Sequence, residues 1–198
     1  MQKLKDMSIE RRANKFSALL QSCEITIEDG ASLGVEPGIM AAFQMLTQVR
    51  DSGSVYVIGN GGSAAVASHA VIDLINVARL RAFTLHEPSV LTCIVNDYGY
   101  ENAYSRLLRH IARPGDVLIA ISSSGHSMNI RNAVEQVINN GGRVITLSGF
   151  LHDNPLRALG HINIWLNASD YGLVEIGHQF ILHNLSDRFW AGWGVATA

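Results

Sequence analysis

The sequence predicts an α/β fold in which a parallel β-sheet is covered by helices on both faces. Short apolar segments such as DVLIAIS (116–122) alternate along the chain with longer segments of helical periodicity, and strands that are apolar throughout are usually buried on both faces. In addition, glycine-rich or serine-rich segments directly follow two of these strands. Parallel sheets bind their ligands at such positions, at the carboxyl ends of the strands.

Two helices are expected before the first strand. Apolar residues recur every three or four positions over residues 8–28, which is typical of an amphipathic helix. A second helix is expected from Ile39 to near Gly53, after a break marked by glycines and Pro37. Because these helices precede the sheet, they are free to pack outside it or against another subunit.

From residue 53 onward, strands and helices alternate. Strands are expected at 54–58, 82–85, 116–122, 143–149 and 161–166, and helices at 63–77, 89–95, 101–111, 127–139 and 171–193. The chain shows no internal repeat, linker or low-complexity segment. We therefore predict one domain over 1–198, with N-terminal helices in 1–52 and an α/β core in 53–198.

Composition narrows the class of protein. The chain has 198 residues, of which 47% are hydrophobic and 16% charged, so it can bury a full core. Its net charge of −2 gives no electrostatic support for binding nucleic acid or a membrane surface. The charged N-terminus lacks the apolar centre of a signal peptide, and Cys23 and Cys93 form no spaced motif. These features predict a cytoplasmic protein with free thiols.

The first candidate ligand loop is GNGGS, residues 59–63. Glycines let backbone N–H groups face an anion, and the helix that follows adds its positive end. Asn60 and Ser63 add side-chain donors. Gly59, Gly61 and Ala64 also fit a relaxed dinucleotide fingerprint, for which Glu87 is the nearby acidic candidate. The loop can thus be interpreted as an anion site, as part of a dinucleotide site, or as a tight turn without a ligand.

The second candidate loop is SSSGHS, residues 122–127. Four hydroxyl groups lie beside a glycine and a new helix N-terminus, which is more than helix capping needs. Hydroxyl and backbone N–H groups together bind phosphate without lysine or arginine. Two such loops on neighbouring strands favour a compact phosphorylated ligand.

A third feature indicates proton or metal chemistry. His69 and Asp73 are four residues apart on the helix after the first loop and share one face. Glu175 and His183 are eight residues apart on the last helix. If these residues meet, they form either a general base and acid pair or a site for a divalent transition metal such as zinc.

Taken together, GNGGSAA, NDYGYE, GDVLIAISSSGHS and the glutamate and histidines of VEIGHQFILH resemble the sugar isomerase (SIS) domain family. Within it they resemble the phosphoheptose isomerase branch, from about Phe16 to the end. The resemblance implies a flavodoxin-like αβα sandwich with a five-stranded parallel sheet and extra N-terminal helices. It also implies a homotetramer with active sites between subunits.

The implied reaction interconverts sedoheptulose 7-phosphate and D-glycero-D-manno-heptose 7-phosphate through an enediol, for lipopolysaccharide heptose biosynthesis. The family's base maps to Asp73 and its acid to His183. The zinc site of some members maps to His69, Asp73, Glu175 and His183. The substrate contacts that the resemblance implies are Asn60, Gly61, Gly62, Ser63, Asp97, Ser122, Ser123, Ser124, Ser127, Asp170 and Glu175.

The chain departs from the family pattern at several positions. The base is aspartate instead of glutamate, Glu175 stands where glutamine is common, and Val77 replaces an arginine. These departures leave open an isomerase for another sugar phosphate. A non-catalytic scaffold for a protein partner of the replication-initiator type is the alternative from a different class, and nicotinamide binding ranks last.

Overall fold

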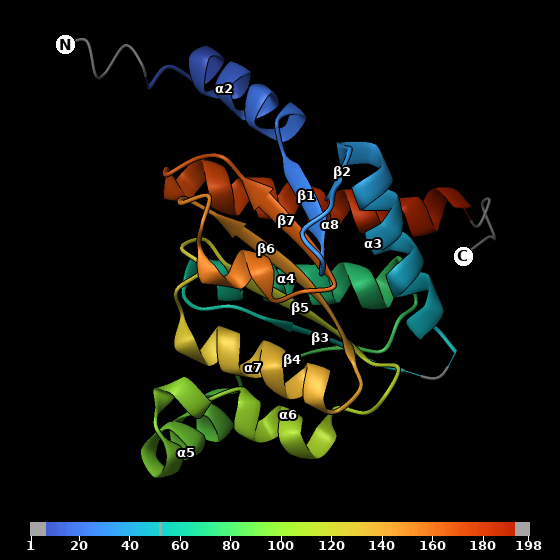
Figure 1. The fold of residues 1–198 in the computed structure, drawn as a ribbon, viewed down its shortest axis with the longest axis vertical. Coiled ribbons are helices and arrows are strands. Elements are labelled where there is room, and N and C mark those ends of the chain that lie inside the picture. Colours follow the sequence, from blue (N-terminus) through green and yellow to red (C-terminus); the bar gives the residue numbers. More distant parts are fainter. Residues whose placement is uncertain (1–6, 52, 193–198) are drawn as a thin grey trace.

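The computed structural model describes residues 7–51 and 53–192 (Figure 1). Its elements in chain order are α2 (Ile9–Gln21), β1 (Glu24–Ile27), β2 (Ser32–Leu33), α3 (Val35–Val49), β3 (Val55–Ile58), α4 (Gly62–Asn76), β4 (Ala82–Thr84), α5 (Pro88–Tyr98), η1 (Tyr100–Asn102), α6 (Ser105–Ile111), β5 (Val117–Ser122), α7 (Met128–Asn139), β6 (Arg143–Gly149), η2 (Pro155–Ala158), β7 (Ile162–Leu166) and α8 (Tyr171–Gly192). Residue 193, the last one predicted for the final helix, lies outside the described residues.

The sheet has seven strands in the order β2-β1-β7-β6-β5-β3-β4. The five strands β3, β4, β5, β6 and β7 are parallel to one another. In contrast, β1 is antiparallel to β7, and β2 is antiparallel to β1. The prediction of a five-stranded parallel sheet is therefore wrong for the sheet as a whole, which is larger and mixed. The parallel part has the flavodoxin-like strand order, with its switch point between β3 and β5.

Of the two extra strands, β1 comes from the segment 8–28 that was predicted to be helical, and β2 comes from the predicted break after it. Helix α2 ends at Gln21, and residues 24–27 (EITI) pair with β7. Cys23 and Ile27 are four residues apart, which fits a helix. The same residues also alternate with polar ones through the fully buried Ile25, and this two-residue period is typical of a strand. Branched residues favour the strand, and pairing satisfies the backbone groups at the free edge of β7.

The start of α3 also differs from the prediction. The break was expected to extend through Gly38, but the helix begins at Val35, with Pro37 and Gly38 inside its first two turns. Proline is tolerated there because the first N–H groups of a helix have no partner within the helix. Similarly, the predicted helix at 101–111 begins as the 3₁₀ turn η1 and continues as α6.

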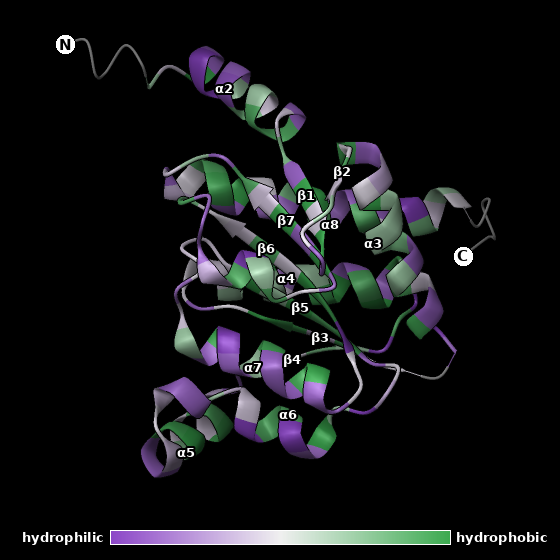
Figure 2. Cartoon of the chain, viewed as in Figure 1, coloured by the Kyte–Doolittle hydropathy of each residue, from purple (hydrophilic) through white to green (hydrophobic). Residues whose placement is uncertain are grey.

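Helices cover both faces of the sheet (Figure 1). One hydrophobic core lies between the sheet and helices α3, α4 and α8, and a second lies between the sheet, α6, α7 and η2. Figure 2 shows the apolar residues of the helices turned toward the strands and polar residues on the outer sides of α6 and α7. Because α4 and α8 lie on the same face, residues of these two helices can share a site.

Helix α2 extends away from the sheet (Figure 1). It is attached to α8 by the Arg12–Asp170 ion pair, with a shortest N–O distance of 2.5 Å, and by an edge-to-face contact between Phe16 and Phe180. Within residues 7–51 and 53–192, no helix combines the length and the apolar character needed to cross a membrane.

Candidate active site

The first loop turns sharply between β3 and α4. Gly61 has a φ of +54°, a conformation that side chains with a Cβ rarely adopt, and α4 begins at the next residue. The buried hydroxyl of Tyr104 donates a hydrogen bond of 2.8 Å to the carbonyl of Gly59, which fixes the loop from behind. Burial raises the pKa of Tyr104 to about 12, so the phenol stays protonated and remains a donor.

The second loop joins β5 to α7 and has hydroxyl groups that the fold does not use. Ser127 occupies the N-cap position of α7, but its side chain makes no capping hydrogen bond. It lies 3.3 Å from the Ser122 hydroxyl. The Ser123 hydroxyl oxygen is buried and has no hydrogen-bond partner among the described residues. A buried unpaired hydroxyl is unfavourable, so this loop is suited to receiving a polar ligand.

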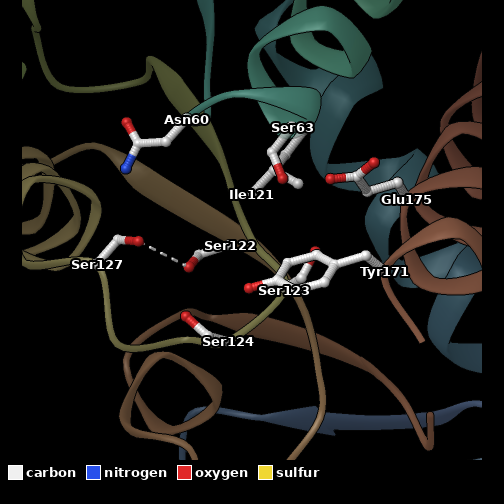
Figure 3. A pocket seen from close by; sticks show the side chains of 9 residues that line it. All are labelled: Asn60, Ser63, Ile121, Ser122, Ser123, Ser124, Ser127, Tyr171 and Glu175. Atoms are coloured by element: carbon white, nitrogen blue, oxygen red, sulfur yellow. Dashed lines mark hydrogen bonds between the residues drawn. The ribbon is translucent and has the colours of Figure 1, made fainter. Parts of the chain in front are cut away.

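The two loops enclose one open pocket of about 150 Å³ (Figure 3). Its donor side consists of Asn60, Ser63 and the serines of the second loop, and among the described residues neither lysine nor arginine lines it. Its other side is formed by Tyr171 and Glu175 of α8. Hydroxyl and amide donors suit a phosphate group, while the Glu175 carboxylate repels it. The pocket therefore favours a ligand with phosphate toward the serines and hydroxyl groups toward Glu175.

His69, Asp73 and His183 form a second group, on α4 and α8. Asp73 Oδ2 lies 2.9 Å from His183 Nδ1 and 3.6 Å from His69 Nε2. One ligand atom from each residue lies within 4.8 Å of the other two. The carboxylate of Asp73 is mostly buried, whereas both imidazoles are about half exposed. The cluster therefore opens to the outer surface of the α4–α8 layer.

The geometry of this cluster fits a divalent metal. Although His183 Nδ1 is close to Asp73 Oδ2, the contact lacks hydrogen-bond alignment, and this buried oxygen has no hydrogen-bond donor among the described residues. Two imidazole nitrogens and a carboxylate oxygen that converge without bonding one another are a suitable ligand set for zinc. The same three groups are also suited to proton transfer.

Glu175 lies in the pocket instead of in this cluster. Its carboxylate oxygens are 2.4 and 2.5 Å from the position that a Cβ on Gly62 would take. Thus the glycine at the start of α4 makes room for the glutamate. The structure brings together three of the four predicted metal ligands, and places the fourth beside the serines.

Four predicted substrate contacts do not line the pocket: Gly61 and Gly62 of the first loop, and the two carboxylates Asp97 and Asp170. Asp170 accepts a hydrogen bond from the Leu173 backbone N–H near the start of α8 and pairs with Arg12, which lowers the pKa of its carboxyl to about 2. Asp97 is exposed on α5, where Asn96 donates to it at 2.9 Å. Within one chain, neither carboxylate lines the space beside the two loops.

The structure adds residues that the sequence reasoning missed. Tyr171 extends from the first turn of α8 into the pocket (Figure 3) and contacts Phe150 edge to face, with ring centres 4.7 Å apart. Phe150 has a φ of +59°, which is rare for a bulky residue. In the sequence, Tyr171 could have been found because it directly follows Asp170, a predicted substrate contact.

Glu87, the acidic residue that dinucleotide binding would require, is engaged elsewhere. The Glu87 carboxylate caps α5, accepting hydrogen bonds of 2.9 Å from the Val90 N–H and from the Ser89 hydroxyl. These hydrogen bonds also lower the pKa of Glu87. A carboxylate engaged in a helix cap is poorly placed to receive a ribose hydroxyl.

The pocket and the cluster are separated along two helices. Asp73 follows Gly62 by eleven residues on α4, and His183 follows Glu175 by eight on α8. At the helical rise, these steps correspond to roughly 16 and 12 Å. Side chains tilt toward the helix N-terminus, which shortens the gap. A ligand that contacts both groups must therefore be elongated.

Comparisons with known proteins agree with this geometry. The SIS domain family model matches residues 36–149. The phosphoheptose isomerase of Geotalea daltonii is 36% identical over 165 residues, which cover 79% of this chain and 85% of that protein. The phosphoheptose isomerase structure from Neisseria gonorrhoeae superposes with a TM-score of 0.73 at 30% identity, over 92% of both chains. One from Francisella tularensis, with a TM-score of 0.75 at 24% identity over 91% of both chains, supports the fold alone. The chain belongs to the SIS-domain family and, within it, to the phosphoheptose isomerases.

Proposed function

We propose that this protein is an aldose–ketose isomerase that interconverts sedoheptulose 7-phosphate and D-glycero-D-manno-heptose 7-phosphate. The observation that carries the proposal is the pairing of a serine-lined anion pocket with the His69–Asp73–His183 cluster further along α4 and α8. A seven-carbon chain with its phosphate spans about 10 Å at roughly 1.2 Å per bond. That length suits a ligand anchored in the pocket with its carbonyl end near the cluster.

The serine side of the pocket holds the phosphate. Ser123 supplies a hydroxyl group without a partner among the described residues, Ser127 supplies one that does not cap its helix, and Asn60 supplies an amide. Since no cationic side chain within 7–51 and 53–192 lines the pocket, phosphate binding rests on neutral donors and on the N-terminal ends of α4 and α7. Glu175 accepts hydrogen bonds from sugar hydroxyl groups on the opposite side.

The isomerisation itself is a proton transfer between neighbouring carbons. Asp73, as the base, removes a proton from C1 of the ketose to give the enediol and returns a proton to C2, which gives the aldose. His183 moves a proton between the oxygens on C2 and C1, so that charge does not accumulate on either. The 2.9 Å separation of the two side chains lets them act on adjacent atoms of one substrate.

The cluster also suits zinc, with His69, Asp73 and His183 as the proposed ligands. When bound, the metal would supply positive charge next to the substrate oxygens. Glu175 as a further ligand stays a prediction.

We further propose a cytoplasmic homotetramer of single-domain chains with active sites between subunits. Large apolar side chains are exposed on α4 (Ile72 and Ile75) and on α8 (Ile176 and Phe180), at 46 to 58% of their surface. An exposed apolar face of this kind favours association. Assembly would also bring residues of a second chain near the half-exposed histidines.

The test is turnover of sedoheptulose 7-phosphate by the purified protein, followed by NMR of the aldose product. The assay is repeated after chelation and after zinc is returned. We expect conversion, and loss and recovery of activity if the cluster holds the metal. No conversion in any of the three states, with other sugar phosphates turned over, would reassign the substrate. No turnover of any sugar phosphate, with a stoichiometric protein partner recovered, would support the scaffold reading.

A further inference from the structure

Behind the pocket, Asn60 is hydrogen-bonded to two residues, Asn129 and Tyr100, to which the proposed chemistry gives no role. Asn60 Nδ2 donates a hydrogen bond of 2.9 Å to Asn129 Oδ1, and Asn129 Nδ2 donates one of 2.9 Å to Asn60 Oδ1. The Tyr100 hydroxyl donates a third bond, of 3.0 Å, to the same Asn60 oxygen. The two amides therefore face each other as a reciprocal pair.

This arrangement determines what Asn60 offers to a ligand. Its Oδ1 accepts two hydrogen bonds and has no remaining lone-pair site, while its Nδ2 has used only one of two hydrogens. In Figure 3 the amide nitrogen of Asn60 is turned toward Ser127 and its oxygen is turned away. Thus Asn60 presents a donor to the pocket and no acceptor.

Asn129 is the buried member of the network. It is 2% exposed and lies in the first turn of α7, directly after the serine loop. The pair thereby connects the glycine-rich loop after β3 to the helix after β5, across the switch point of the sheet. Because the two bonds are reciprocal, neither amide can turn over alone without losing both, and the Tyr100 hydroxyl adds a donor on the side of the Asn60 oxygen.

We infer that Asn129, together with Tyr100, is a positioning residue that keeps the Asn60 amide turned so that its free N–H faces the phosphate. The ligand's identity rests on the proposed function, whereas the amide orientation rests on the contacts alone. If the Asn60 amide rotated by half a turn, its carbonyl oxygen would face the phosphate oxygens and repel them. Asn129 and Tyr100 oppose this rotation from behind, because it would set the Asn60 oxygen against the Asn129 oxygen.

The test begins with Asn129→Leu, which keeps the side-chain size and removes both amide bonds. We expect the KM for sedoheptulose 7-phosphate and the Kd for inorganic phosphate to rise roughly three- to tenfold, as for one lost hydrogen bond. We expect kcat to change much less, because the reacting carbons lie far from Asn60. Tyr100→Phe, at a residue that is 48% exposed and tolerant of change, should shift the same constants in the same direction.

Gln136→Leu is the matched control. Gln136 lies two turns further along α7 and donates a hydrogen bond of 2.8 Å to the Asn140 side-chain oxygen, near the other end of the helix. It should leave both constants at the wild-type values. If Gln136→Leu and Asn129→Leu raise KM equally, the effect of Asn129 is a general loosening of α7 and the inference is wrong.

A double-mutant cycle then separates positioning from direct contact. In an Asn60→Ala background, the effect of Asn129→Leu on phosphate Kd should vanish, because its target side chain is absent. Additive effects would overturn the inference.

The two proposals fail in different ways. If the wild type binds inorganic phosphate with the expected coupling but does not convert the heptose phosphate, the positioning role stands and the substrate assignment falls. Normal turnover with an unchanged KM in both Asn129→Leu and Tyr100→Phe would leave the function standing and overturn the positioning role.

Discussion

The carboxylate of Glu175 fills the space that a side chain on Gly62 would need. Its two oxygens lie 2.4 and 2.5 Å from the ideal Cβ position of that glycine. Contacts this short are not possible between real atoms, so a larger residue at position 62 would displace the glutamate. The position of the Glu175 carboxylate in the second turn of α8 therefore depends on a glycine at the first residue of α4.

Gly62→Ala should consequently impair substrate binding more than folding. The added methyl group pushes a flexible carboxylate aside, and alanine is favoured over glycine in a helix by about 0.5–1 kcal/mol. We expect KM for the heptose phosphate to rise, with an unchanged or slightly higher melting temperature. Gly192→Ala is the control, because no atom of the described part of the chain lies within 4 Å of its ideal Cβ position. An unchanged KM in Gly62→Ala would mean that Glu175 does not contact substrate.

Glu175→Gln should strengthen binding of inorganic phosphate. The variant removes a negative charge from a pocket that no described lysine or arginine lines, while its amide oxygen can still accept from a sugar hydroxyl. Isothermal titration at low and high salt measures the effect, which should be larger at low salt because ions screen charge. Zinc content should stay the same, since the Glu175 carboxylate lies apart from the His69–Asp73–His183 cluster. A loss of zinc would restore Glu175 as a ligand.

His183→Ala should lower kcat by at least about 100-fold, as expected when a general acid is removed. Its partner variant Asp73→Asn, which keeps the side-chain size, should lose activity to a similar degree. His110→Ala on α6 is the control, since this histidine lies on the opposite face of the sheet. Circular dichroism establishes that the variants are folded. Full activity in His183→Ala would exclude this histidine from the proton transfer.

The two loops of the site could be predicted because their composition and their place after a strand are visible in the local sequence. The glycine-rich and serine-rich loops follow buried apolar strands, and a parallel sheet places such loops at one edge. The meeting of Asp73 and His183 followed from family resemblance, because no spacing rule connects two helices that are over a hundred residues apart. Three-dimensional packing alone gives their 2.9 Å contact.

The misses have equally specific causes. Residues 24–27 form a strand because they pair with the edge of β7. Since β7 lies far away in the sequence, the local pattern around residue 25 does not reveal this pairing. Asn129 was overlooked because a lone asparagine in a helix has many roles, and only the reciprocal bonds with Asn60 distinguish this one. Glu175 looked like a fourth ligand from its helical spacing, but its side chain reaches toward Gly62 instead.

The stability of the protein should depend on pH through His178. This imidazole is fully buried on α8, and its Nε2 lies 3.1 Å from the Ser148 carbonyl, so Nε2 carries the hydrogen and donates it. Burial lowers its pKa to about 4, against the opposing effect of that hydrogen bond. In the unfolded chain the pKa is about 6.5. Between these values the unfolded chain binds a proton that the folded chain does not, so stability falls as the pH drops from 6.5 toward 4, by up to about 3 kcal/mol.

Urea denaturation at several pH values between 7 and 4.5 measures this loss in the wild type and in His178→Gln. Glutamine can still donate to the Ser148 carbonyl but does not titrate. We expect the variant to be less stable than the wild type at pH 7 and the difference to shrink as the pH falls. His161, whose pKa is also lowered by burial, is present in both proteins and cancels in the comparison. Stability curves that stay parallel across the range would show that His178 does not provide the pH dependence.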